Sequence, residues 1–164
     1  MKKVLSEEEA ILQCREWKRN GRRVVCVSGA FALLHPGHIR LLEQARSYGD
    51  VLIVVLESSS AANAATLRLV SPAVERIEIL SALAAVDFVT NFSGSSLSTF
   101  LDDLHPDVVV SGAEPRSGLH PAQSAGHKTA VGMEAGKGPK IILLPLEPGY
   151  STKLLLDRIA QLPS

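Results

Sequence analysis

The sequence predicts an α/β fold, a Rossmann-like five-stranded parallel sheet with helices on both faces. Short runs of apolar, mostly β-branched residues alternate along the chain with helical patterns. Those runs are continuously apolar, which is typical of parallel strands that are covered on both sides. With 164 residues, 46% of them hydrophobic, residues 1–164 have the size and the apolar content of a single compact domain.

Each element has its own local signal. The strand pattern occurs over residues 22–28, 51–57, 87–92, 106–112 and 140–146. Helical patterns occur over residues 6–21, 37–48, 72–84, 96–105 and 151–162. The first helix starts at a capping box formed by Ser6 and Glu9, and Gly21 ends it. Because right-handed crossovers join the strands of such a sheet, the helices should cover both of its faces.

The loops that follow the strands are the candidate functional segments, because ligands of open parallel sheets bind beyond the carboxyl ends of the strands. Two of these loops are long, residues 58–70 and 113–139. Connections of that length in a compact domain are usually active-site lids or disordered segments.

Composition excludes several classes of protein. Lys plus Arg and Asp plus Glu are both 17, so no overall charge favours nucleic acid or an anionic membrane as the partner. The apolar runs are too short to span a bilayer, and residues 1–10 carry no secretory signal, so we expect a cytoplasmic protein. Cys14 and Cys26 form neither a metal cluster nor a disulfide framework, and we expect them to be packing residues.

The first candidate site is the segment "SGAFALLHPGHIRLLEQA", residues 28–45. Pro36 suits the first position of a helix, which places His35 at the cap and His38 in the first turn. Both rings and the free N–H groups of the helix then meet at a point that favours an anion. We predict that His35 and His38 are catalytic and stabilise a phosphate that gains charge in the transition state. The alternative is a simple cap and a half-buried core ring.

The second candidate site is "GYST", residues 149–152, which follows the last strand and opens the last helix. Its hydroxyls and free N–H groups suit phosphate, although such a start is also ordinary capping. Two helix N-termini that face one crevice could hold a triphosphate between them.

These segments resemble a known superfamily. The stretch "SGAFALLHPGHIRLLEQARSYGDVLIVVL" is similar to that of nucleotidyltransferases with a Gly-x-Phe-Asp-x-x-His-x-Gly-His signature. Further matches are "VERIEILSALAAVDFV", "LHPDVVVSGAE" and "IILLPLEPGYSTKLLLDRI". Together they look most like the adenylyltransferase domain of bacterial ADP-heptose synthesis proteins, with glycerol-3-phosphate cytidylyltransferases as more distant relatives.

The resemblance implies a reaction. A nucleoside monophosphate would pass from ATP, or alternatively CTP, to a sugar 1-phosphate or similar phosphate ester, releasing pyrophosphate. Mg²⁺ would be held mainly by the substrate phosphates, with no metal ligand from the protein, and the chain would form a homodimer. The expected nucleotide-binding residues are Ser28, Gly29, Ala30, Phe31, Gly37, Arg76, Gly112, Ala113, Glu114, Tyr150, Ser151 and Thr152.

The chain also departs from the superfamily pattern. Ala32 stands where the signature has Asp, and "ESSS" (57–60) and "SGAEP" (111–115) replace segments that carry charged residues in relatives. Loss of charge would weaken a transfer that depends on charge stabilisation. Arg116, His120, His127, Lys128 and Lys137 could resupply it or could simply solvate a loop. Two alternatives therefore stay open, a catalytically impaired nucleotide-binding relative with a regulatory or binding role and a structural domain without a ligand.

Overall fold

The computed structural model describes residues 3–57, 71–94, 96–113, 138–145 and 147–162. The strands are β1 (Val4–Leu5), β2 (Val24–Gly29), β3 (Val51–Glu57), β4 (Phe88–Phe92), β5 (Val108–Ala113) and β6 (Lys140–Pro145). The helices are α1 (Glu7–Arg19), α2 (Pro36–Arg46), α4 (Ala73–Ala82), α5 (Leu97–Leu104) and α7 (Thr152–Ala160). All five strands and all five helices predicted from the sequence are present, with ends that differ by a few residues.

The strands form one parallel sheet in the order β1-β4-β3-β2-β5-β6. The predicted α/β, Rossmann-like fold is therefore confirmed, but the predicted count of five strands is wrong. The sixth strand, β1, pairs Val4 with Val89 of β4 at the edge of the sheet. Two residues are too few to produce a periodic pattern, so β1 could not be predicted from the sequence.

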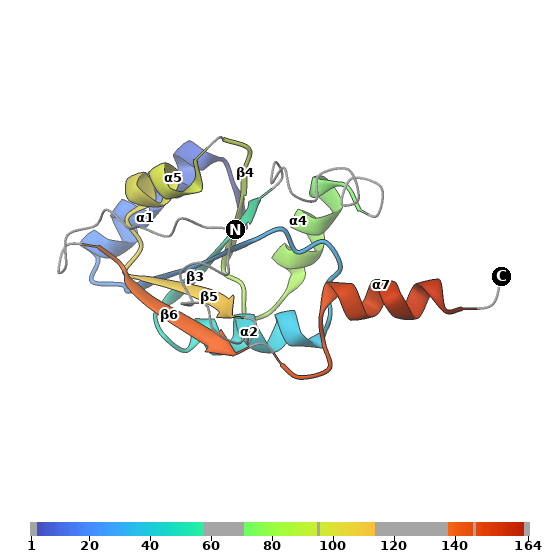
Figure 1. The fold of residues 1–164 in the computed structure, drawn as a ribbon. Coiled ribbons are helices and arrows are strands. Elements are labelled where there is room, and N and C mark those ends of the chain that lie inside the picture. The colour runs from blue at the N-terminus through green and yellow to red at the C-terminus, as the bar shows by residue number, and fades with distance from the viewer. Residues whose placement is uncertain (1–2, 58–70, 95, 114–137, 146, 163–164) are drawn as a thin grey trace.

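Two layers of helices enclose the sheet (Figure 1). On one face, α1 and α5 pack against a core that includes Cys26, Ile53 and Phe88. On the other face, α2 and α4 pack against side chains such as Val27 and Val54. Alternate residues of the central strands supply the two cores, which explains why the strand sequences are apolar throughout. Cys14 and Cys26 are free and buried in the first of these cores.

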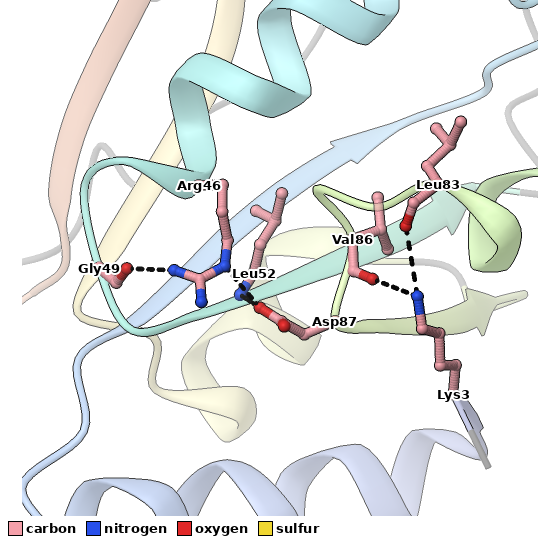
Figure 2. Close-up of polar contacts among 7 residues, drawn as sticks. All are labelled: Lys3, Arg46, Gly49, Leu52, Leu83, Val86 and Asp87. Atoms are coloured by element: carbon pink, nitrogen blue, oxygen red, sulfur yellow. Dashed lines mark hydrogen bonds and ion pairs between the residues drawn. The ribbon is translucent and has the colours of Figure 1, made fainter. Parts of the chain in front are cut away.

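Aspartates pin the strands together at the amino edge of the sheet. An aspartate precedes each of β3, β4 and β5, and its carboxylate accepts a hydrogen bond from a backbone N–H at the start of a neighbouring strand. The pairs are Asp50 with Arg23 (2.7 Å), Asp87 with Leu52 (2.7 Å) and Asp107 with Val24 (2.8 Å). Asp87 also forms an ion pair with Arg46 at the end of α2, with 2.8 Å between Nε and the carboxylate (Figure 2). These contacts fix the register of the central strands.

The helix α7 lies apart from this layered body. It extends from the carboxyl side of β6 away from the sheet (Figure 1), and none of its residues is buried. Within the described residues, no helix is long and apolar enough to cross a membrane.

Candidate functional site

The site is built around the start of α2, directly after β2. His35 is the N-cap residue and Pro36 the first helical residue, as the sequence predicts. The ring of His35 makes no capping hydrogen bond, however, and instead stacks on the ring of His38, with 3.8 Å between centroids and 24° between planes. His35 is 7% exposed, and the Nδ1 atoms of both rings are buried without a hydrogen-bond partner among the described residues. Buried nitrogen atoms without partners suit a ligand that accepts or donates hydrogen bonds there.

Burial controls the charge of both histidines. Burial first, and the neighbouring His35 second, lower the pKa of His38 from its ordinary value of 6.5 to about 4. Burial also lowers the pKa of His35. Both rings are therefore neutral at pH 7 in the free protein, and each offers one N–H donor. An anion bound beside them would favour the protonated forms and strengthen those hydrogen bonds.

The turn between β2 and α2 packs against the histidines. Phe31 has the left-handed φ of 45°, which is uncommon for a residue with a side chain. Its buried ring lies 5.3 Å from the ring of His38 and occupies the space beside Gly29, where an added Cβ would lie 3.2 Å from it. The guanidinium of Arg76, on α4, donates a hydrogen bond to the backbone carbonyl of Ala30. The structure thus brings four predicted residues together near His38, namely Gly29, Ala30, Phe31 and Arg76.

The second predicted helix start lies against the first. Ser151 is the N-cap of α7, and its hydroxyl accepts a hydrogen bond from the N–H of Leu154 at 3.1 Å. The ring of Tyr150 stacks with that of His35, with 6.2 Å between centroids and 22° between planes. Gly37 makes room for this contact, because an added Cβ would lie 3.0 Å from Nδ1 of His35 and 3.1 Å from Cβ of Tyr150. The N-termini of α2 and α7 are therefore neighbours.

The other predicted residues lie along the carboxyl edge of the sheet. Ser28 stands near the end of β2, and Gly112 and Ala113 end the adjacent strand β5, whose Val110 pairs with Val27. Thr152 is the first residue of α7. Several residues named from the sequence lie outside the described residues. They are Glu114, Arg116, His120, His127, Lys128, Lys137 and residues 58–70.

The sequence reading missed two charged residues beside this site. Arg40, on α2, forms an ion pair with Glu147, in the turn before α7, and its guanidinium lies 5.6 Å from the centroid of the Tyr150 ring. Arg40 could be recognised as an exposed cation two residues after His38. No local pattern connects it with a partner 107 residues away.

A hollow of about 440 Å³ adjoins His35 on the outer side of α2. It is lined by Leu34, His35, Pro36, Ile39, Arg40 and Glu43. Its volume lies within the usual range for small-molecule sites.

The arrangement suits a polyanion. Two helix N-termini, two neutral imidazoles and the guanidinium of Arg76 offer hydrogen-bond donors, and the nearby carboxylate of Glu147 is paired with Arg40. In the ranges that the structure describes, no group of three or more His, Cys, Asp or Glu residues could hold a metal ion.

The chain is similar to known proteins in sequence and in fold. A family profile described as cytidylyltransferase-like matches residues 26–157. The chain is 34% identical over 163 residues to the bifunctional protein HldE of Acidiphilium cryptum and 33% identical over 164 residues to that of Escherichia coli. These alignments cover 97% and 96% of this chain but 32% of each relative. The chain thus spans about a third of the length of the curated relatives it matches.

Two solved structures share the fold. The lipopolysaccharide core biosynthesis protein of Thermoplasma volcanium superposes with a TM-score of 0.60 at 22% identity, covering 77% of this chain and 99% of that one. The pantoate-beta-alanine ligase of Francisella tularensis, which was crystallised with an ATP analogue and beta-alanine, gives a TM-score of 0.57 at 17% identity. That superposition covers 88% of this chain and 68% of the ligase.

Proposed function

This chain belongs to the cytidylyltransferase-like family, and from that premise we propose that it is a nucleotidyltransferase that transfers AMP from ATP to a sugar 1-phosphate or similar phosphate ester. The observation that carries the proposal is the stacked pair of His35 and His38 at the start of α2, with unpartnered buried Nδ1 atoms. Adenylyl rather than cytidylyl transfer rests on the similarity to HldE proteins.

In the proposed reaction an oxygen of the acceptor phosphate attacks the α-phosphorus of ATP in line with the leaving group. A new P–O bond forms, the bond from the α-phosphorus to the bridging oxygen breaks, and its electron pair leaves with pyrophosphate. Mg²⁺ bound to the phosphates of ATP would neutralise part of their charge. The N–H groups of His35 and His38 donate to oxygens that gain negative charge, and the free N–H groups at the start of α7 hold the far end of the triphosphate.

A second function is favoured by one specific feature. Ala32 lies in the turn between β2 and α2, where the resembled signature has Asp, and no described carboxylate takes that place beside the histidines. A relative that binds nucleotide without turnover, in a regulatory or binding role, is the competing proposal.

Pyrophosphate release distinguishes the two proposals. The wild type is assayed with ATP and with CTP against a panel of sugar 1-phosphates and polyol phosphates in the presence of Mg²⁺. Transfer to one acceptor class supports the enzyme, and ATP binding without turnover on any acceptor supports the impaired relative. His38→Ala should lower kcat about 100-fold or more, because a donor to the developing charge is lost. His105→Asn is the matched control, since His105 is exposed at the end of α5.

A further inference from the structure

The position of α7 is not explained by core packing. None of its residues, Thr152–Ala160, is buried. Helices in proteins are usually held by an apolar face that packs on the core. Contacts of the turn that precedes α7, residues 147–150, must therefore fix where its N-terminus lies relative to α2.

Those contacts converge on one side chain of α2. The guanidinium of Arg40 pairs with the carboxylate of Glu147, the first described residue after β6. The same guanidinium lies 5.6 Å from the ring centroid of Tyr150, within the range of a cation–π interaction. The turn closes on itself through a hydrogen bond from the N–H of Tyr150 to the carbonyl of Glu147, at 3.3 Å. Arg40 thus binds both ends of this turn.

The same turn also contacts the histidine pair. Tyr150 stacks with His35, and Ser151 directly follows it as the cap of α7. Gly37 allows the close approach, since its missing Cβ leaves the space that Tyr150 and His35 occupy. A displacement of the turn would therefore move the cap of α7 and the ring beside His35 together.

We propose that Arg40, Glu147 and Tyr150 form a latch that positions the N-terminus of α7 against His35, and so sets the gap in which a nucleoside triphosphate is held. This inference rests on the proposed function. Arg40 and Glu147 act through Tyr150 and the cap of α7, so these two are positioning residues. When the latch is open the two helix starts no longer face one crevice, and the fraction of molecules that can bind falls. The apparent Kd and the KM for ATP rise by the inverse of that fraction, while kcat at saturating ATP changes little.

A charge-reversal series tests the latch. Arg40→Glu and Glu147→Arg each place like charges together, and the double variant restores an ion pair with its charges exchanged. Tyr150→Phe keeps the ring and Tyr150→Ala removes it. Asp157→Asn is the matched control, because it breaks an exposed ion pair with Lys153 that lies wholly within α7.

Three measurements are made on each variant. Amide hydrogen exchange over residues 147–156 reports the turn without any nucleotide. Titration with Mg²⁺ and α,β-methylene ATP reports binding, and steady-state kinetics separate KM from kcat. We expect each single reversal and Tyr150→Ala to speed exchange in this segment and to weaken binding about fivefold, the size expected for a partly exposed ion pair and cation–π contact. The double reversal should recover most of the loss, Tyr150→Phe should keep the wild-type exchange, and Asp157→Asn should resemble the wild type.

The outcomes separate the two proposals. Wild-type exchange and wild-type ATP affinity in Arg40→Glu and Glu147→Arg would overturn the latch and leave the proposed function intact. Weakened binding that the double reversal does not recover would also overturn it. Failure of the wild type itself to bind the nucleotide analogue would overturn the proposed function, and with it the role of the latch in holding a triphosphate.

Discussion

The imidazole rings of His35 and His38 stack with centroids 3.8 Å apart, and the pKa of His38 lies at about 4. Since that value is below the ordinary 6.5, the unfolded chain binds more protons than the folded one between pH 6.5 and 4. The free energy of unfolding should therefore fall as pH falls through this window, by about 2 kcal/mol between pH 7.5 and 5 from His38 alone. Urea unfolding at several pH values measures this slope.

His38→Gln removes the titrating group and keeps a polar side chain of similar length. Its stability should depend less on pH in the same window than that of the wild type. An equal slope in wild type and His38→Gln would show that the His38 ring does not titrate in this window in the folded protein.

Replacement of Gly37 should weaken nucleotide binding and leave the free energy of unfolding nearly unchanged. A methyl group there would lie 3.0 Å from Nδ1 of His35 and 3.1 Å from Cβ of Tyr150, closer than ordinary contacts. Alanine also favours the helix by roughly 1 kcal/mol over glycine, so Gly37→Ala should unfold near the wild-type urea midpoint. It should bind Mg²⁺-ATP about tenfold more weakly, because the rings must move apart. Calorimetric titration checks this, with Gln44→Ala on the exposed side of α2 as control.

The sequence predicted those features whose signal lies within a short segment of the chain. The strands and helices, the cap at His35 and the start of α7 at Ser151 all lie within short segments, and each was visible in the order of residues. The ion pair of Arg40 with Glu147 joins residues 107 apart in the chain. Only the strand order, with β6 beside β5 and β5 beside β2, brings their loops together.

The aspartates at the amino edge of the sheet show the same limit. That an aspartate precedes β3, β4 and β5 is plain in the sequence, yet an aspartate before a strand is also an ordinary turn residue. Its partner is a backbone N–H on a different strand, which is known only when the strand order is known. The sequence therefore showed the residues of this edge but not their role.

Asp87 should be important for stability and unimportant for binding. Its carboxylate accepts from the N–H of Leu52 at 2.7 Å and pairs with Arg46 at 2.8 Å (Figure 2). Asp87→Asn keeps the shape but loses the charge, and we expect the free energy of unfolding to fall by about 1–2 kcal/mol, since hydrogen bonds to charged groups are stronger than neutral ones. Urea unfolding measures this loss. The exposed Asp102 serves as control through Asp102→Asn, and an equal effect of the two substitutions would contradict a special role for Asp87.

Arg76 joins α4 to the turn that precedes α2, and its replacement should affect both folding and binding. Arg76 is 4% exposed, its guanidinium donates to the carbonyl of Ala30, and its Nε has no hydrogen-bond partner among the described residues. A planar guanidinium can hold the carbonyl and still donate to a phosphate oxygen, which a lysine ammonium cannot do with the same geometry. Arg76→Lys should therefore lower the free energy of unfolding by about 1–2 kcal/mol and weaken Mg²⁺-ATP binding about tenfold. Urea unfolding and calorimetric titration measure the two effects. Arg15→Lys is the control, because Arg15 is an exposed residue of α1. Loss of stability with unchanged ATP affinity would restrict Arg76 to holding the turn, and wild-type behaviour in both measurements would remove it from the site.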